Sequence, residues 1–314
     1  MSGTLLLGFD IGGTKSAAIV GDSDGNALAR EEFRTARPEE SIPLLIEIGR
    51  RLCGGEQPKA CGIACGGPLS SREGLILSPP NLPGWDRVPI VQSIQDAFGA
   101  PAALENDANA CAVAEWRWGL KCQVDDLVYL TCGTGMGAGI VLGGRLVRGK
   151  QDLAGEIGHV RLLPIGPVGY YKAGSIEGLT SGHALGELAR LRLQEPHEAS
   201  RLDRIPIEQV TGKDVGAAAV NGDPLAVRLV HEQATYLGQA CAMLIDILNP
   251  QRISLGSTAQ RLGSLLIDGV REAAKREALP AAFENCVIDK AVLGDQIQDL
   301  AALAIAHDAA ESVG

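Results

Sequence analysis

Apolar runs separated by glycine-rich turns open the chain and predict an antiparallel meander. Residues 5–10 and 16–21 are β-type apolar runs on either side of Gly12-Gly13-Thr14, and a polar turn at 22–26 leads into a third strand that ends near Phe33. Glycine and polar residues between short apolar runs are typical of hairpin turns. The first bend therefore consists largely of bare backbone.

The same pattern returns in the middle of the chain. Residues 127–131 form an apolar run, Gly133-Thr134-Gly135 begins a glycine-rich turn, and a second apolar run starts at Ile140. Two strand–turn–strand units of one type suggest a structural duplication, with two related domains that each begin with a hairpin.

Helical and strand patterns interleave along the rest of the chain, which predicts an α/β fold. The expected helices are 38–52, 91–98, 108–118, 181–193, 223–248, 259–277 and 296–310, and the further strands are 59–64, 102–104 and 252–255. The longest helix starts after an Asn-Gly pair and stops at Asn249-Pro250, because proline cannot continue a helix. Residues 194–213 form a polar stretch between two of these helices.

Composition narrows the class of protein. The 314 residues are 46% hydrophobic, with a net charge of −10 and eight cysteines, none in a Cys-x-x-Cys pair. At about 150 residues per domain the length suggests two domains, and the acidity argues against nucleic acid or an anionic membrane as a partner. The start shows no signal-peptide pattern, and no apolar stretch reaches the ~18 residues that span a bilayer. We therefore expect a cytoplasmic protein with reduced, packed thiols.

Two familiar phosphate-binding loops do not fit the context of the glycine-rich turns. A P-loop has Gly directly before its Lys and a helix after it, but Thr14 precedes Lys15 and a β-type run follows. A dinucleotide fingerprint also opens a helix, whereas the Gly133-x-Gly135-x-Gly137 pattern leads into a strand. The remaining interpretation is two hairpin tips that grip a polyphosphate through backbone N–H groups and the hydroxyls of Thr14 and Thr134, with Asp10 holding Mg²⁺ through water.

Four motifs in order resemble those of the ROK sugar kinases, which belong to the actin, hexokinase and Hsp70 ATPase-fold superfamily. They are Asp10-Ile-Gly-Gly-Thr-Lys15, Glu105-Asn106-Asp107-Ala108-Asn109, Gly133-Thr134-Gly135 and Gly155-Glu156-Ile157-Gly158-His159. The resemblance extends from near Leu6 to beyond Gly256 and implies two ribonuclease-H-like domains with ATP and sugar in the cleft between them. It implies a smaller N-terminal domain over 1–110 and a larger one over 111–295, with the last helix (296–314) packed back on the first.

By this resemblance Asp107 is the catalytic base, at a strand-to-helix junction where a carboxylate can face a cleft and take the proton of an acceptor hydroxyl. An isolated Asp at such a junction is otherwise a helix N-cap. The resemblance assigns the sugar to Gly67, Asn81, Asn106, Glu156, His159 and Glu177. It assigns the nucleotide to Asp10, Gly12, Gly13, Thr14, Lys15, Gly133, Thr134, Gly135, Gly137 and Gly256. Ser257 stands where the family usually has a second Gly.

The sequence departs from the family at a stretch that holds a structural Zn²⁺ in many ROK proteins. The family's run contains cysteines that bind zinc together with a histidine, but residues 166–177 contain no cysteine, and Ser175 takes the last one's place. Without thiolates this tetrahedral site cannot form. We therefore expect that the protein binds no zinc and that His159 is free to bind the sugar. We also expect this difference from the family to alter which sugar is bound more than which reaction is catalysed.

The leading hypothesis is an ATP- and Mg²⁺-dependent hexose kinase that phosphorylates the 6-hydroxyl of glucose. Kinases for N-acetylmannosamine, N-acetylglucosamine, fructose and allose share the motifs, and polyphosphate is an alternative donor. The other large class of the family is the sugar-responsive transcription factor, which has an N-terminal DNA-binding domain; only nine residues precede Asp10 here. A non-sugar ATPase or a catalytically inactive sensor is a third alternative, and a homodimer is the family's common assembly.

Overall fold

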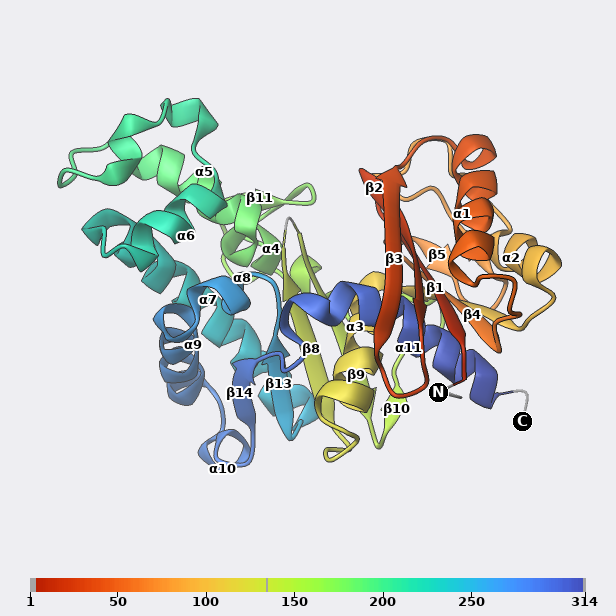
Figure 1. Cartoon of the computed structure of the whole chain (residues 1–314). Coiled ribbons are helices and arrows are strands. Elements are labelled where there is room, and N and C mark those ends of the chain that lie inside the picture. Colours follow the sequence, from red (N-terminus) through yellow and green to blue (C-terminus); the bar gives the residue numbers. More distant parts are fainter. Residues whose placement is uncertain (1–3, 134, 313–314) are drawn as a thin grey trace.

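Two five-stranded mixed sheets form the framework of the chain in a computed structural model, which describes residues 4–133 and 135–312 (Figure 1). The strand order is β3-β2-β1-β4-β7 in the first sheet and β10-β9-β8-β13-β14 in the second. In each sheet three antiparallel strands are continued by two parallel ones. The α/β class is confirmed, and both sheets have the same pattern of strand pairing.

The predicted meander forms the antiparallel part of the first sheet. Its strands are β1 (Leu6–Ile11), β2 (Lys15–Gly21), β3 (Ala27–Arg34), β4 (Ala60–Cys65) and β7 (Ala102–Asn106). The second sheet contains β8 (Leu127–Cys132), β9 (Met136–Leu142), β10 (Arg145–Leu146), β13 (Arg252–Leu255) and β14 (Val287–Lys290). Two small hairpins consist of β5 (Leu69–Ser70) with β6 (Leu75–Ile76) and β11 (Val168–Gly169) with β12 (Lys172–Ala173). The sequence prediction included neither β14 nor the β11–β12 hairpin.

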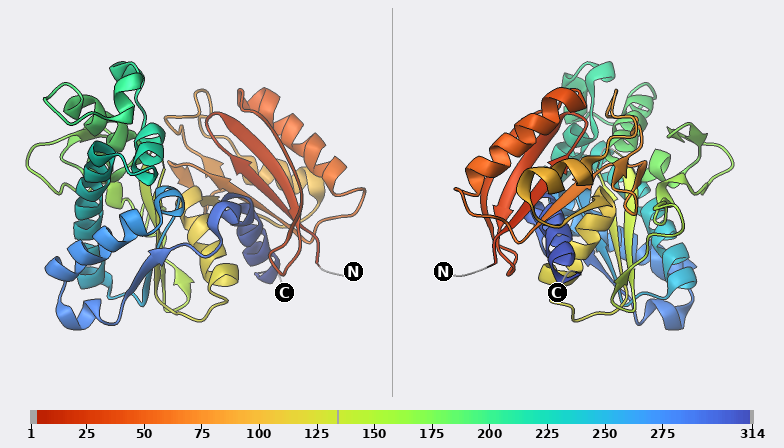
Figure 2. Two further views of the ribbon diagram at one scale, coloured as in Figure 1. Left: turned by 60° about the vertical axis from the view of Figure 1, so that its left-hand side comes forward. Right: turned by 90° about the vertical axis from the view of Figure 1, so that its right-hand side faces the viewer.

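Helices cover both faces of the first sheet, which explains why β1 and β4 are almost continuously apolar and buried. Helices α1 (Pro38–Leu52) and α2 (Ile90–Phe98) lie on the outer face, and α3 (Asp107–Ala114) and α11 (Ile297–Glu311) lie on the inner one. Helices α3 and α11 also pack in one buried cluster with side chains of β8 and β9, so they form a shared layer between the two sheets (Figure 2).

The last helix approaches the first sheet very closely. A Cβ atom at Gly62 of β4 would lie 2.1 Å from the carbonyl oxygen of Ala302, and one at Gly8 of β1 would lie 2.9 Å from the Ala302 Cβ. Only glycine leaves room for helix backbone at this distance. The last helix therefore packs directly on the first sheet. The domain boundaries at 110 and 296 remain predictions.

The other helices cover the second sheet and extend beyond it. They are α4 (Ile176–Thr180), α5 (Gly182–Arg192), α6 (Gly212–Val220), α7 (Pro224–Leu248), α8 (Thr258–Leu262), α9 (Ser264–Glu277) and α10 (Pro280–Phe283). Short 3-10 turns occur at η2 (Ile157–His159), η3 (Arg201–Arg204), η4 (Ile207–Gln209) and η5 (Gly294–Gln296), and a π-helical turn, η1 (Glu115–Gly119), follows α3. The single helix predicted over 259–277 is wrong, because Gly263 has φ 52 and separates α8 from α9.

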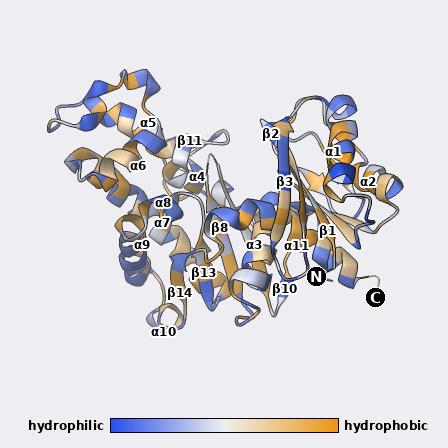
Figure 3. Cartoon of the chain, viewed as in Figure 1, coloured by the Kyte–Doolittle hydropathy of each residue, from blue (hydrophilic) through white to orange (hydrophobic). Residues whose placement is uncertain are grey.

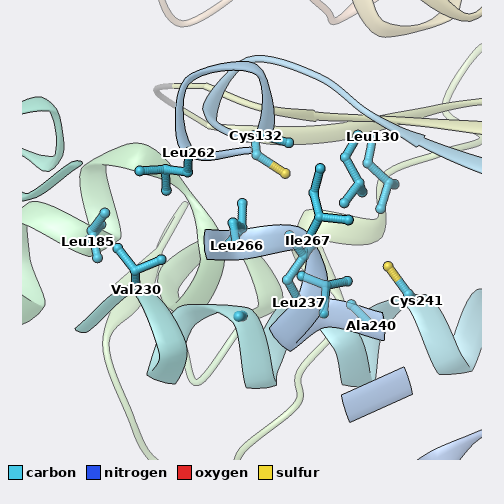
Figure 4. Close-up of a cluster of buried hydrophobic side chains, with 14 of the residues drawn as sticks. Leu130, Cys132, Leu185, Val230, Leu237, Ala240, Cys241, Leu262, Leu266 and Ile267 are labelled. Carbon is cyan, nitrogen blue, oxygen red and sulfur yellow. The ribbon is translucent and has the colours of Figure 1, made fainter. Parts of the chain in front are cut away.

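The hydrophobic core follows this layering. Figure 4 shows its largest cluster, in which Leu130 and Cys132 of β8 lie with Leu237 of α7 and Leu266 and Ile267 of α9. Strands inside the sheets, such as β8 and β13, are largely hydrophobic, whereas the edge strand β3 is largely hydrophilic (Figure 3). All eight cysteines are free, and seven of them are buried. None of the described helices combines the length and apolarity that crossing a bilayer requires.

Candidate active site

Asp107 lies where β7 ends and α3 begins. The Asn106 side chain is the N-cap of α3 and accepts the Ala108 N–H at 2.9 Å; Asp107 Oδ1 lies 2.8 Å from the same nitrogen. Since Asn106 occupies the N-cap position, capping alone does not explain Asp107. The second carboxylate oxygen of Asp107 has no hydrogen-bond partner within the described part of the chain.

Asp10, near the end of β1, forms an acidic pair with Asp107. Burial raises the pKa of Asp10 to about 7, the negative charge of Asp107 acts in the same direction, and Arg30 acts in the opposite one. Burial also raises the pKa of Asp107, while the hydrogen bond from Ala108 lowers it. Asp10 is half-buried and Asp107 is exposed, and two neighbouring carboxyl groups of this kind form a favourable environment for a divalent cation.

The first glycine-rich turn is pressed against the loop that contains Asn81. A Cβ atom at Gly13 would lie 2.4 Å from the Asn81 carbonyl oxygen, so only glycine fits. Thr35 donates its hydroxyl hydrogen bond to the Gly12 carbonyl at 2.6 Å and holds the turn from the other side. The Lys15 ammonium forms an ion pair with Glu32 on the neighbouring strand. In this structure the Lys15 side chain is therefore paired with a residue of β3.

The second glycine-rich turn connects β8 and β9 and contacts two other candidate elements. The backbone N–H of Met136 donates to Glu177 Oε2 at 3.0 Å, and a Cβ atom at Gly135 would lie 2.8 Å from the same oxygen. A Cβ atom at Gly137 would lie 3.5 Å from the Ala108 Cβ, in the first turn of α3. Thr134 falls outside the described residues.

The candidate sugar-binding residues gather around Asp107. Burial raises the pKa of Glu156; the charge of His159 lowers it, and the charges of Asp107 and Glu177 raise it. His159 Nε2 lies 4.0 Å from Glu156 Oε2. Gly67 is also adjacent, since a Cβ atom there would lie 3.5 Å from Asn106 Nδ2. Candidate residues that follow the first sheet and candidate residues that follow β9 are therefore close enough to influence one another electrostatically.

The stretch that lacks the zinc-binding cysteines folds as the β11–β12 hairpin beside His159. The Tyr170 ring at its tip packs edge-on against the His159 imidazole with 4.7 Å between ring centroids. Lys172 Nζ donates to the His159 carbonyl at 2.6 Å. Aromatic packing and an ion-to-carbonyl hydrogen bond hold this segment, and the donor set present here, one histidine among tyrosines, does not match a Cys₃His zinc site.

Trp85, four residues after Asn81, lies in the core. Its side chain is 1% exposed, and its indole N–H donates to the Ala36 carbonyl at 3.0 Å. A tryptophan that is buried with its donor satisfied is a packing residue.

A cavity of about 820 Å³ lies next to the glycine-rich turn between β8 and β9, and most of the residues that line it were not among the predicted site residues. Gly133, Ser257, Thr258, Lys213 and Arg261 line it together with residues of α5 and α6. The Gly182 N–H donates to the Gly133 carbonyl at 2.7 Å, which attaches α5 to the turn. The available signal was the set of glycines at 182, 186 and 212, which lets α5 and α6 approach closely.

A buried polar network behind Asp107 was also missed. Glu105, 1% exposed in its side chain, accepts from Arg148 Nε at 2.6 Å and from Asn109 Nδ2 at 2.9 Å. On the same loop as Arg148, Asp152 accepts from the Ser71 hydroxyl at 2.6 Å and from the Ser71 N–H at 3.0 Å. The loop after β10 is thus attached to Glu105 in β7 and to Ser71 after β5, close to the start of α3.

Comparison with known proteins shows which sequences this chain is similar to. A model of the ROK family matches residues 6–309. A glucokinase of Streptomyces coelicolor is 33% identical over 281 residues, which is 87% of this chain and 87% of that protein. An N-acetylmannosamine kinase of Escherichia fergusonii is 33% identical over 256 residues, covering 80% of this chain and 82% of that one.

The chain is also similar to a transcriptional repressor and to a solved kinase structure. A xylose repressor of Caldicellulosiruptor bescii is 30% identical over 245 residues, which cover 78% of this chain and 61% of the repressor. The crystal structure of a ROK family glucokinase from Streptomyces griseus, in complex with glucose and AMPPNP, superposes with a TM-score of 0.82 at 31% identity, over 97% of this chain and 99% of that one.

Proposed function

The chain belongs to the ROK family, and on that premise we propose that it is a kinase that transfers the γ-phosphoryl group of ATP to a hexose, with glucose the favoured acceptor and its 6-hydroxyl the site of transfer. N-acetylmannosamine, N-acetylglucosamine, fructose and allose are the alternative acceptors. The relatives that are named kinases act on glucose and N-acetylmannosamine, which supports a sugar as the acceptor.

The position of Asp107 carries this proposal. Its carboxylate interacts electrostatically with Asp10, beside the first glycine-rich turn, and with Glu156, beside the candidate sugar residues. Phosphoryl transfer requires an acceptor hydroxyl and a γ-phosphate held in line, with a base at the hydroxyl. The influence of Asp107 on both groups supports its assignment as this base.

Asp107 would accept the proton of the hydroxyl as the oxygen attacks phosphorus. Desolvation raises the pKa of Asp107, and a less acidic carboxylate is a better proton acceptor near neutral pH. Asn106, Glu156, His159 and Glu177 would bind the other hydroxyls, together with Gly67 and Asn81. A site with several such polar groups rejects an analogue that lacks a hydroxyl, because the unmatched group stays desolvated.

The two glycine-rich turns would hold the phosphates, through Gly12, Gly13, Thr14 and Lys15 in the first and through Gly133, Thr134, Gly135 and Gly137 in the second. Mg²⁺, held through water by Asp10, would neutralise phosphate charge when bound. The acidic pair of Asp10 and Asp107 supports such a cation, since the negative charge of Asp107 raises the pKa of Asp10 and a cation between them would offset that repulsion.

The cavity beside Gly133 favours a nucleotide over polyphosphate as the donor. A polyphosphate needs only the turns, whereas a cavity of about 820 Å³ with a largely apolar lining offers room for a base and ribose next to Gly256. Lys213 and Arg261 at this cavity have no carboxylate within 4.0 Å among residues 4–133 and 135–312. Two cations without anionic partners suit the phosphates of ATP.

A coupled assay over a panel of hexoses and N-acetylhexosamines tests the proposal. Asp107→Asn is expected to lose turnover by at least about a thousandfold while thermal shifts with sugar and nucleotide persist. Asp268→Asn, an exposed surface change on α9, serves as the matched control. Full turnover of Asp107→Asn would refute the assigned base, and sugar binding without any ADP release would favour a regulatory protein.

A further inference from the structure

We propose that Ser257 is a nucleotide-contacting residue: its hydroxyl donates a hydrogen bond to the phosphate chain of the bound nucleotide, and the protein keeps a strained backbone to hold it there. This inference rests on the proposed function, because it takes the cavity beside Ser257 to be the nucleotide site. The proposal assigns a function to Ser257, which stands where the ROK family usually has the second glycine of a Gly-Gly pair.

Ser257 has a backbone conformation that suits glycine. Its φ is 48° and its ψ is −98°, outside the small left-handed region that residues with a Cβ atom can occupy. Positive φ combined with such a ψ is costly for serine and free for glycine. Strained residues of this kind persist where the surroundings fix them, and they concentrate at ligand sites.

Both neighbours of Ser257 are fixed to β8 and its turn. The Gly256 N–H donates to the Leu130 carbonyl at 2.8 Å, and the Thr258 hydroxyl donates to the Cys132 carbonyl at 2.5 Å. A Cβ atom at Gly256 would lie 2.2 Å from the Tyr129 hydroxyl oxygen, so the chain packs directly against that ring. With both sides held, the backbone cannot rotate to relieve the strain at Ser257.

The Ser257 hydroxyl is placed between the cavity and the second turn. Ser257 lines the cavity, and its Oγ lies 3.5 Å from Thr131 Oγ1 and 3.7 Å from the point where a Gly133 Cβ would be. The side chain makes no capping bond to α8, although it precedes that helix. In the long contact between the two hydroxyls Thr131 can be the donor, so the Ser257 hydroxyl can donate where phosphates would pass from the cavity to the turn, and charged phosphate oxygens are strong acceptors.

Two substitutions separate the hydroxyl from the strain. Ser257→Gly removes both, and Ser257→Ala removes the hydroxyl while a Cβ atom keeps the strain. Each variant is expected to weaken binding of a non-hydrolysable ATP analogue by about five- to tenfold, the loss of one hydrogen bond to a charged group, with the sugar Kd unchanged. Without ligand, only Ser257→Gly is expected to raise Tm, by about 2 °C or more.

The experiment is a calorimetric titration of nucleotide and of sugar, separately, into wild type, both variants and Ser264→Ala, an exposed control at the start of α9. A Ser257→Gly variant that binds the analogue as tightly as wild type overturns the proposal, as does an unchanged Tm for that variant. If wild type binds the analogue and the variants bind it equally well, only the role of Ser257 falls. If wild type binds no nucleotide at all, the proposed kinase function falls with it.

Discussion

Glu177 Oε2 accepts a hydrogen bond from the backbone N–H of Met136 at 3.0 Å. The resemblance to sugar kinases places Glu177 at the sugar, whereas Met136 directly follows the glycine-rich turn expected at the phosphates. One carboxylate therefore joins the two halves of the candidate site, and its loss would affect both.

Glu177→Ala is accordingly expected to raise the KM for sugar and the KM for ATP, each by about tenfold, because the Met136 N–H and the turn lose their partner. Glu177→Gln, whose amide oxygen can still accept from Met136, should keep the KM for ATP near the wild-type value. Steady-state kinetics with each substrate varied in turn provide the measurement. A change confined to the sugar KM in the alanine variant would contradict this coupling.

Asp10 is predicted to destabilise the folded protein at neutral pH. Its pKa is raised from 3.8 to about 7, so the folded state binds this proton more tightly than the unfolded chain does. The free energy of unfolding then falls as pH rises between those two values and stays low above them. In buffer without divalent cations, Asp10→Asn should therefore raise the stability by at least about 1 kcal/mol at pH 8 and change it little near pH 4.

Thermal unfolding of wild type and Asp10→Asn across that pH range checks the sign. Asp24→Asn, on the exposed turn between β2 and β3, is the control, and its effect on the stability should not depend on pH in this way. The same Asp10→Asn variant is expected to lose kinase activity, since the residue that would hold Mg²⁺ is gone. Equal stability differences at both ends of the range would argue against a raised Asp10 pKa.

Tyr170 is expected to set the orientation of the His159 imidazole. The edge-on packing of the two rings is worth about 1 kcal/mol beyond burial, so Tyr170→Ala should raise the sugar KM about fivefold with the ATP KM unchanged. Tyr171→Ala is a matched control, because the Tyr171 ring is 95% exposed and packs on Tyr170 rather than on His159. Equal effects of the two variants on the sugar KM would show that the hairpin tip as a whole, rather than the Tyr170 ring, is responsible.

Arg148 is predicted to stabilise the start of α3 through Glu105. Arg148→Ala leaves a carboxylate that is 1% exposed without its cation, and this should lower the free energy of unfolding by about 2 kcal/mol or more. Adding Glu105→Gln should recover part of the loss, because a neutral amide needs no cation. Urea unfolding of the single and double variants measures the coupling, with Lys150→Ala on the same loop as the control. Additive effects would contradict a direct pairing.

Much of the fold was predictable because its strands are buried on both faces. Continuous apolar runs such as β1, β4 and β8 stand out against glycine turns, and the start and stop signals of α7 are explicit. By contrast, β14 is only four residues long and half exposed, and the break between α8 and α9 depends on the φ of Gly263. Neither leaves a clear trace in hydrophobic periodicity.

The candidate site was predictable only where one short motif contains the chemistry. Asp10, Asp107 and Glu156 follow from local motifs, whereas the Glu105–Arg148 ion pair joins residues 43 positions apart. The cavity beside Gly133 is assembled from α5, α6 and the segment after β13, which no single window of sequence displays together. Such sites are formed by long-range packing, and the hydrophobic periodicity of a sequence carries no information about it.

The close approach of α11 to Gly62 has a consequence for how the polypeptide matures. On a ribosome, β1 to β7 leave the exit tunnel long before residues 297–311 are made, and until then the inner face of their sheet lacks the part of its cover that α11 supplies. Domains that are contiguous in sequence can fold during synthesis, but this sheet must wait until α11 has been made, and until then its glycine-lined face is open to non-native contacts. We expect nascent chains that are stalled before α11 to bind chaperones and to be cleaved readily by protease.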